Sequence, residues 1–343
     1  MKKIFKIIKQ NTIGFVFGLV VTVTSVYAAV VIAASSVGYT DNASLGATNV
    51  QDAIDKLNTK ATTKIKEAEA KCPDGYKCIK PLCKRATTLH TETCSQRSTS
   101  SYCSGDGYTL NDTITYGNFG TKGVLTSGDA FDCDVNGDGV YDSETERFYY
   151  VSDATNGVTN DNSIAVLIYY NNVSRGIASN SAVYAYDESK SNNNGPVTAI
   201  AQLPTIEQWN NVSLKNTTRA ITNENGENTT SAGNLPTTFS YLGYAARLLT
   251  YQEVYNGCYD ETTPITSTKG LSTKCKYLME NTKYSSSSLK TYGGWLESPR
   301  SSYSEYNWRI YSGNRNTNGS QVYDSNSIGV RPAIEVSKTI IDY

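Results

Sequence analysis

The chain has 343 residues, of which 18% are charged, and its formal net charge is -1. Such a balanced charge provides no attraction to nucleic acid or to an anionic membrane surface, so nucleic acid is not expected as a partner. Tyrosine is common, with 26 residues against 7 phenylalanines and 3 tryptophans. Most aromatic side chains therefore carry a hydroxyl, which favours an extracellular, β-rich protein.

The first 36 residues have the pattern of a membrane anchor. Four lysines occur before position 10, and residues 13–34 then contain no charge. About 20 apolar residues cross a bilayer as a helix, and the basic flank stays in the cytoplasm. We therefore expect a transmembrane helix within 1–36, in a single-pass cell-membrane protein whose C-terminal domain is extracellular. The alternative is a secreted protein, with the leader cleaved at the signal-peptidase pattern of residues 26–28.

Residues 37–71 are expected to form a polar linker followed by a short amphipathic stalk helix. Apolar residues recur every three or four positions over residues 49–70, as on one face of an α-helix. Residues 45–57 resemble a short helical motif that is repeated in phage tail fibres and bacterial surface fibres. The resemblance implies a homo-oligomer formed through this helix. A single spacer helix is the alternative, because a coiled-coil seam this short is marginal.

The eight cysteines indicate disulfides, since an even number of cysteines in an exported chain usually pairs. None of them forms a C-x-x-C pair, which argues against a zinc ribbon or a thioredoxin-like site. Loop closure is easiest over short separations, so Cys94 with Cys103 and Cys258 with Cys275 are the first candidate pairs. Residues 72–84 contain three cysteines and are expected to form a disulfide-clasped neck. Buried, reduced cysteines are the alternative.

Residues 132–144 hold the sharpest chemical motif of the chain. Asp134, Asn136 and Asp138 take positions 1, 3 and 5 of an EF-hand-like or dockerin-like loop, with Gly139 at position 6. Oxygen ligands two residues apart around a glycine turn suit Ca²⁺. Position 12 falls on a threonine, so a neighbouring glutamate would have to supply the carboxylate. We expect a structural calcium ion, and an acidic hairpin turn is the alternative. The expected ligands are Asp132, Asp134, Asn136, Asp138, Asp142 and Glu144.

From residue 85 onward the sequence predicts short strands and two helices. Strand-like patterns cover residues 85–92, 113–116, 146–151 and 163–170, and the last of these is apolar enough for a central strand.

The two helix starts are predicted from capping boxes. Thr205 with Gln208, and Thr250 with Glu253, have the spacing at which the hydroxyl accepts from an early helix N–H while the later side chain reaches back.

The segment 292–336 has the composition of a contact surface. Trp295 and Leu296 open it, and the apolar run 330–336 closes it like a buried strand. The residues between are mainly Tyr, Asn, Ser, Gly and Arg. Tyrosine provides rigid amphipathic area, while Ser, Gly and Asn provide adaptable hydrogen bonding. The alternative is a long polar loop between two strands.

The order of these features resembles bacterial C-type-lectin-fold domains, the group that includes formylglycine-generating-enzyme-like domains and the variable proteins of diversity-generating retroelements. The resemblance lies in short motifs: Leu-Pro-Thr at 203–205, Arg-Leu-Leu-Thr at 247–250, Gly-Gly-Trp at 293–295 and Gly-Val-Arg-Pro-Ala at 329–333.

This resemblance implies an α+β, C-type-lectin-like ligand-binding domain over 85–343, with a twisted antiparallel sheet and two helices. It places the ligand face within 292–328. The ligand-binding residues it implies are Tyr303, Tyr306, Trp308, Tyr311, Asn314, Arg315, Asn316, Asn318 and Tyr323.

The chain departs from the catalytic members of that group. It has no cysteine after Cys275, whereas formylglycine-generating enzymes use a reactive pair late in the domain. It lacks the Glu-Pro-Asn, Gln-Pro-Asp and Trp-Asn-Asp motifs of calcium-dependent sugar lectins. The single histidine, His90, excludes zinc sites built on several imidazoles, and we expect it to be a structural or surface residue.

We therefore expect a non-enzymatic, adhesin-like surface protein that binds an unidentified protein or glycan. The alternatives are a structural fibre or pilus-like subunit and an enzyme on a formylglycine-generating-enzyme-like scaffold.

Overall fold

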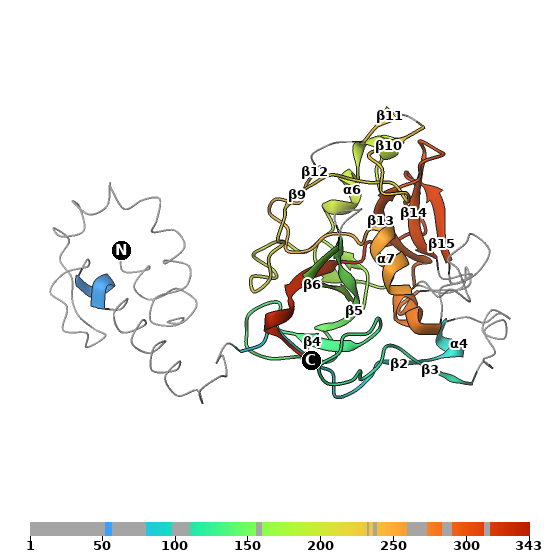
Figure 1. Cartoon of the computed structure of the whole chain (residues 1–343). Helices are drawn as coiled ribbons and strands as arrows, with labels where there is room; N and C mark the ends of the chain where they lie inside the picture. The colour runs from blue at the N-terminus through green and yellow to red at the C-terminus, as the bar shows by residue number, and fades with distance from the viewer. Residues whose placement is uncertain are drawn as a thin grey trace, which may run out of the picture. The chain divides into compact units, whose positions relative to one another are not determined.

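The computed structural model describes residues 52–56, 80–97, 109, 111–155, 160–231, 233–235, 239–258, 273–282, 290–311 and 316–343. The chain divides into two compact units, residues 1–79 and 80–343, and each is described by itself. In the first unit, residues 52–56 are helical and fall within the expected stalk helix. The second unit contains the strands of the described residues (Figure 1).

The expected fold class is wrong in its helical part. Strands dominate the described residues, and the longest of their named α-helices has 8 residues. A helix of that length extends about 12 Å, whereas the apolar core of a bilayer is about 30 Å thick. Accordingly, no helix in the described part of the chain combines the length and apolarity that a membrane crossing requires. The segment for which the sequence predicts an anchor, 1–36, lies outside the described residues.

A six-stranded sheet forms the centre of residues 80–343. Its strands pair antiparallel, except that β1 and β17 are parallel. Because β1 pairs with both β4 and β17, the two ends of this unit meet in one sheet. The order across the sheet is β16 (Ala333–Ser337), β6 (Asn160–Tyr169), β5 (Arg147–Thr155), β4 (Ala130–Cys133), β1 (Cys83–Arg85) and β17 (Ile341–Asp342).

Hydrophobic side chains cover both faces of this sheet. Along β6, Leu167 and Tyr169 belong to one core cluster, whereas Val166 and Ile168 belong to a second. The alternation follows from the two-residue period of a strand. A strand buried on both faces reads as a continuous apolar run, so the prediction of a central strand over 163–170 is confirmed.

A second, three-stranded antiparallel sheet consists of β13 (Gly293–Pro299), β14 (Tyr306–Tyr311) and β15 (Asn316–Gln321). Every residue of β13 is buried. Helix α7 (Tyr251–Cys258) contacts β13 as well as β5, and Figure 1 shows it beside the three-stranded sheet. This sheet and α7 carry the candidate site described below.

The remaining elements are short. They are β2 (Thr91–Thr93), α4 (Cys94–Arg97), β3 (Thr113–Thr115), β7 (Val173–Ser174), β8 (Ile177–Ala178), η1 (Asn192–Asn194), α6 (Val197–Ile200), β9 (Thr218–Arg219), β10 (Thr229–Thr230), β11 (Gly233–Asn234), β12 (Phe239–Ser240), η2 (Thr273–Met279) and η3 (Lys338–Ile340).

Both predicted capping boxes form, but only one begins a helix. The Thr250 N–H donates to Glu253 at 3.0 Å, the Glu253 N–H donates to the Thr250 hydroxyl at 3.1 Å, and α7 follows. At the other box the Thr205 N–H donates to Gln208 at 2.9 Å, yet the chain continues as turns. The prediction of a helix beginning at Thr205 is therefore wrong. The Gln208 side chain also donates to the Arg175 carbonyl at 2.9 Å, so this box fastens a turn to a neighbouring loop.

Two disulfides lie in the described part of the chain. Cys258 is joined to Cys275, one of the two local pairs expected from the sequence. Cys83 is joined to Cys133 across β1 and β4. The prediction that residues 72–84 form a disulfide-clasped neck is therefore corrected at Cys83, because the disulfide of Cys83 joins two strands of the central sheet. Cys103, the expected partner of Cys94, lies outside the described residues.

Candidate functional site

Five aromatic rings and one arginine form a continuous row, which we call the aromatic row. The ring centroids of Tyr303 and Tyr306 are 5.6 Å apart. The Arg300 guanidinium lies 5.1 Å from the Tyr303 ring and 5.0 Å from the Trp308 ring. Tyr251 continues the row at 4.8 Å from Trp308. The members of the row are Tyr303, Tyr306, Arg300, Trp308, Tyr251 and Tyr255.

Helix α7 supplies the far end of the row. Tyr251 and Tyr255 are four residues apart and therefore lie on the same helix face. Their rings are stacked, with an interplanar angle of 21° and centroids 6.5 Å apart. Both tyrosines, like Trp308, pack with one side against the second core cluster and are half-buried. Each ring is thus supported from below and accessible from outside.

At the other end of the row, the buried Asn192 holds the loop of residues 300–306, which connects β13 to β14. Asn192 is 0% exposed, and its side-chain amide donates to the carbonyls of Arg300, Tyr303 and Tyr306 at 2.8 to 3.2 Å. Its own backbone N–H donates to the Ser304 carbonyl at 2.7 Å. The loop therefore keeps one conformation even though Tyr303 itself is 55% exposed.

Glu224 ties this loop to the strand that carries Trp308. One carboxylate oxygen accepts the Ser301 hydroxyl at 2.7 Å. The other accepts the Ser301 N–H at 2.9 Å and the Trp308 indole N–H at 3.1 Å. The Glu224 carbonyl also accepts from Gln252 of α7 at 2.7 Å. Loop, strand and helix are consequently locked together beneath the rings.

Arg300 supplies the positive charge of the row. Its guanidinium lies near two aromatic faces, an arrangement stabilised by the ring quadrupoles. The half-buried Arg300 has no hydrogen-bond partner for its Nε among the described residues. The row thus combines apolar ring area with a positive charge.

The sequence-predicted ligand face is assembled only in part. Tyr303, Tyr306 and Trp308 come together in the aromatic row. Tyr323 has a different neighbour, the Lys190 ammonium at 5.1 Å from its ring, and packs partly against the first core cluster. The remaining predicted residues are Tyr311, Asn316 and Asn318, whose strands but not side chains are described, and Asn314 and Arg315, which lie outside the described residues.

The segment 292–336 also contains buried residues that support the fold, which its composition did not predict. Asn307 is fully buried, and its side-chain amide donates to the Leu296 carbonyl at 2.7 Å. Ile310 and Val322 are buried as well. Sequence reasoning missed Arg300, Tyr251 and Glu224, although the four-residue spacing of tyrosines after the Thr250 cap is a usable signal for a helix face.

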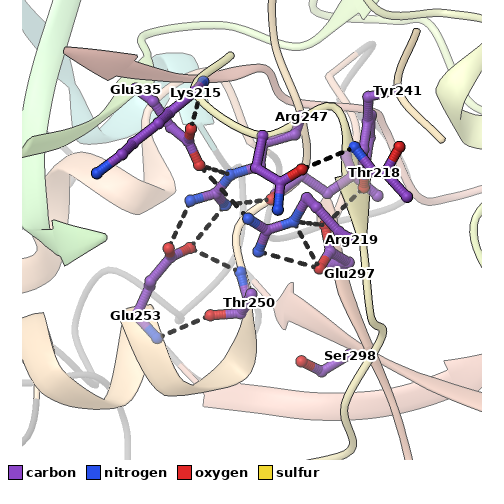
Figure 2. Close-up of polar contacts among 12 residues, drawn as sticks. Lys215, Thr218, Arg219, Tyr241, Arg247, Thr250, Glu253, Glu297, Ser298 and Glu335 are labelled. Atoms are coloured by element: carbon purple, nitrogen blue, oxygen red, sulfur yellow. Dashed lines mark hydrogen bonds and ion pairs between the residues drawn. The ribbon is translucent and has the colours of Figure 1, made fainter. Parts of the chain in front are cut away.

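A second polar cluster lies in the interior (Figure 2). Arg247 is 0% exposed and donates to Glu335 at 2.8 Å and to both oxygens of Glu253 at 2.5 and 2.8 Å. Arg219 lies 3.3 Å from Glu297 and 3.4 Å from Glu335.

The carboxylates of this interior cluster are bound by guanidinium groups. Burial alone would raise the pKa of Glu335, but the charges of Arg247 and Arg219 hold that pKa below its ordinary value. Glu297 additionally accepts the Tyr241 hydroxyl at 2.7 Å. We therefore assign the cluster a structural role: it joins β16, β13, β9 and α7 through buried charge pairs.

The acidic loop between β4 and β5 is the candidate metal site. The Asp132 carboxylate forms an ion pair with the buried Arg147, whose Nε lies 2.7 Å from Asp132 Oδ1. Asp134 Oδ2 accepts the Gly139 N–H at 3.1 Å, and Asn136 Oδ1 and Asp138 Oδ1 accept backbone N–H groups two residues ahead of them.

The two remaining candidates of this loop differ in their surroundings. Asp142 Oδ1 accepts the N–H groups of Glu144 and Thr145, which lowers the pKa of Asp142. Glu144 is exposed. Burial, followed by the charges of Asp138 and Asp134, raises the pKa of Glu146 to about 7. Within the described residues, no three acidic, histidine or cysteine side chains are already gathered in a metal-ligating group.

Comparison with known proteins finds no matching protein family, no matching curated protein and no matching solved structure. The resemblance to C-type-lectin-fold domains therefore stays a prediction from the short motifs.

His90 links the acidic loop to Glu280, which directly follows η2. Its Nδ1 lies 2.6 Å from Glu280, and its Nε2 lies 2.6 Å from the Ser143 carbonyl. Both partners are acceptors, so the imidazolium form donates to both. Burial lowers the pKa of His90, but the hydrogen bond and charge of Glu280 outweigh burial and raise that pKa above 6.5.

Stability is expected to decrease at alkaline pH through His90. Because its pKa is higher in the folded than in the unfolded chain, its contribution is fully present below about 6.5 and is lost as pH rises through the folded pKa. Urea unfolding from pH 5 to 9 should show this decline in the wild type and a smaller one in His90→Asn. Since the chain has one histidine, its proton NMR titration reads the pKa directly. A midpoint at or below 6.5 would contradict the assignment.

Proposed function

We propose that this chain is an extracellular, non-enzymatic binding protein whose aromatic row is the contact surface for a protein or glycan. The two disulfides of the described residues are compatible with an extracellular protein, where such bonds persist. The observation that carries the proposal is the row itself: accessible Tyr, Trp and Arg side chains on a locked backbone.

The composition of the row favours a protein partner. Binding energy at protein interfaces is concentrated in a few Trp, Tyr and Arg residues. The loop backbone is already held by Asn192 and the Trp308 ring by Glu224. Less conformational entropy is therefore lost when a partner docks, and more of the contact energy appears as affinity. Tyr303 is mostly exposed, and the other members of the row are half-buried, so each side chain retains some surface for a partner.

Truncation of Tyr303 is expected to weaken ligand binding. Arrays of extracellular proteins and of glycans, probed with the full chain, identify the ligand class, and titration then gives the affinity. Tyr303→Ala should raise the Kd more than about fivefold, since loss of an interface anchor costs upward of about 1 kcal/mol. Phe119→Ala is the matched control, because Phe119 is 52% exposed but lies outside the row.

The control should leave the Kd within about twofold of the wild type. A ligand whose affinity falls with Phe119→Ala but not with Tyr303→Ala would show that the aromatic row is not the contact surface. Binding confined to the glycan array would assign the row to a sugar instead of a protein.

A further inference from the structure

The loop from Asp134 to Glu146 carries the acidic residues Asp134, Asp138 and Glu146 along a tight turn. Gly137 and Gly139 have φ values of 73° and 85°, which residues other than glycine rarely adopt. The turn therefore folds back on itself and carries Asp138 at its tip, while Asp134 and Glu146 stand at its two ends.

Two buried carboxylate oxygens in this loop have no partner. Asp134 and Glu146 are each 4% exposed, and neither Asp134 Oδ1 nor Glu146 Oε1 accepts a hydrogen bond from the described residues. Buried polar atoms are almost always satisfied, so each exception calls for a partner such as a water or an ion. On a charged carboxylate such an oxygen is especially costly without a compensating cation.

Glu146 is directed into the loop. Its Oε2 accepts the Asp142 N–H at 3.1 Å. The same carboxylate senses the charges of Asp138 and Asp134. Glu146 is the buried acidic residue next to position 12 of the motif, which falls on Thr145.

Two basic residues lie beside the loop without satisfying these oxygens. The Lys80 ammonium donates to the Gly139 carbonyl and lies 3.9 Å from Asp134 Oδ2, the oxygen that Gly139 already binds. The Nε of Arg147 donates to Asp132. Neither contact reaches Asp134 Oδ1 or Glu146 Oε1.

We propose that this loop binds a calcium ion, with Asp134, Asp138 and Glu146 as its charged ligands and with Asp132 outside the site. Asn136, backbone carbonyls and water complete the six to eight oxygens that calcium takes. The carboxylates must draw closer on binding, because they do not yet form a ligating group among the described residues. Calcium tolerates variable geometry, whereas magnesium demands a near-ideal octahedron, so the site selects calcium.

The ion would fasten the loop to its surroundings. Asn211 already binds this region, with its side chain on the Asp134 carbonyl at 2.7 Å and its N–H on the Val135 carbonyl at 3.0 Å. His90 holds the Ser143 carbonyl. A cation between Asp134 and Glu146 removes the carboxylate repulsion that opposes these contacts, and the folded state gains stability by ligand linkage.

Calcium titration of the metal-free full chain tests the site. After chelation and dialysis, addition of CaCl₂ alone should raise the Tm and give one binding isotherm by calorimetry, whereas MgCl₂ at the same concentration should shift the Tm much less. Absence of a calcium-dependent Tm shift and of binding heat at millimolar calcium would overturn the proposal.

Glu146→Gln and Glu144→Gln form a matched pair for assigning the ligand. Both remove one carboxylate from the same loop, but Glu146 is buried in it and Glu144 is exposed. Glu146→Gln should raise the calcium Kd at least about tenfold, equivalent to about 1.4 kcal/mol, and Glu144→Gln should change it less than about twofold. Asp138→Asn, at an exposed position, provides a second ligand variant if Glu146→Gln folds poorly. Equal weakening by Glu146→Gln and Glu144→Gln would mean general charge screening and would overturn the assignment.

Discussion

Replacing Cys83 and Cys133 by alanine is expected to lower the free energy of unfolding by about 4 kcal/mol. The disulfide closes a loop with a sequence separation of 50 residues, so its removal releases much conformational entropy in the unfolded chain. Both cysteines are 0% exposed and face each other across β1 and β4. Their replacement by the small apolar alanine leaves no unsatisfied polar group. Urea unfolding of the full chain, followed by circular dichroism, measures the change.

The second disulfide provides the internal control. Cys258 and Cys275 have a sequence separation of 17 residues and are also fully buried, so the same double replacement should lower stability by about 3 kcal/mol. The longer loop should therefore show the greater loss. A larger loss from the Cys258–Cys275 pair would mean that local packing, and not loop closure, determines the contribution of these bonds.

Local sequence patterns predicted the central strands and one helix. The apolar run at 163–170 and the pattern at 146–151 become β6 and β5, because each buries alternating side chains in two cores. The Thr250–Glu253 box begins α7. Thr205 shows the limit of such patterns: its box forms with similar bonds, but tertiary contacts of Gln208 keep the chain in a turn.

The candidate site was less accessible to sequence reasoning, because its geometry depends on distant segments. Trp308 is held by Glu224, 84 residues earlier, and stacks near Tyr251 of α7. Asn192 fixes the loop of Tyr303 from more than a hundred residues away. Composition indicated that the segment 292–336 contains a surface, but it could not separate the exposed Tyr303 from the buried Asn307.

The acidic loop shows the same division between local and distant information. The spacing of Asp134, Asn136 and Asp138 indicated oxygen ligands around a turn. Strand register explains why Asp132 is not among the proposed calcium ligands and why Glu146 is. The pairing of β4 with β5 sets Asp132 opposite Arg147, which binds its carboxylate, and Glu146 directly precedes Arg147. Register is set by the whole sheet and is not readable from the motif.

Arg247→Met is expected to lower the free energy of unfolding by about 3–5 kcal/mol. The substitution fills similar volume but leaves Glu253 and Glu335 without the guanidinium that binds both of them in the interior. An uncompensated buried carboxylate destabilises the fold far more than a lost surface contact. Arg175→Met is the matched control, because Arg175 is exposed, and its change should stay within about 0.5 kcal/mol.

A double-mutant cycle with Glu253→Gln separates the charge effect from packing. Glutamine retains the side-chain oxygen that accepts the Thr250 N–H, so the capping box of α7 survives while the charge is removed. In the Arg247→Met background this second change removes a buried negative charge that Arg247 no longer neutralises. The double variant should therefore be more stable than the sum of the two single losses predicts, by at least about 1 kcal/mol. Strict additivity in urea unfolding would show that Arg247 stabilises the fold by filling space, and that its bonds to the two glutamates contribute little.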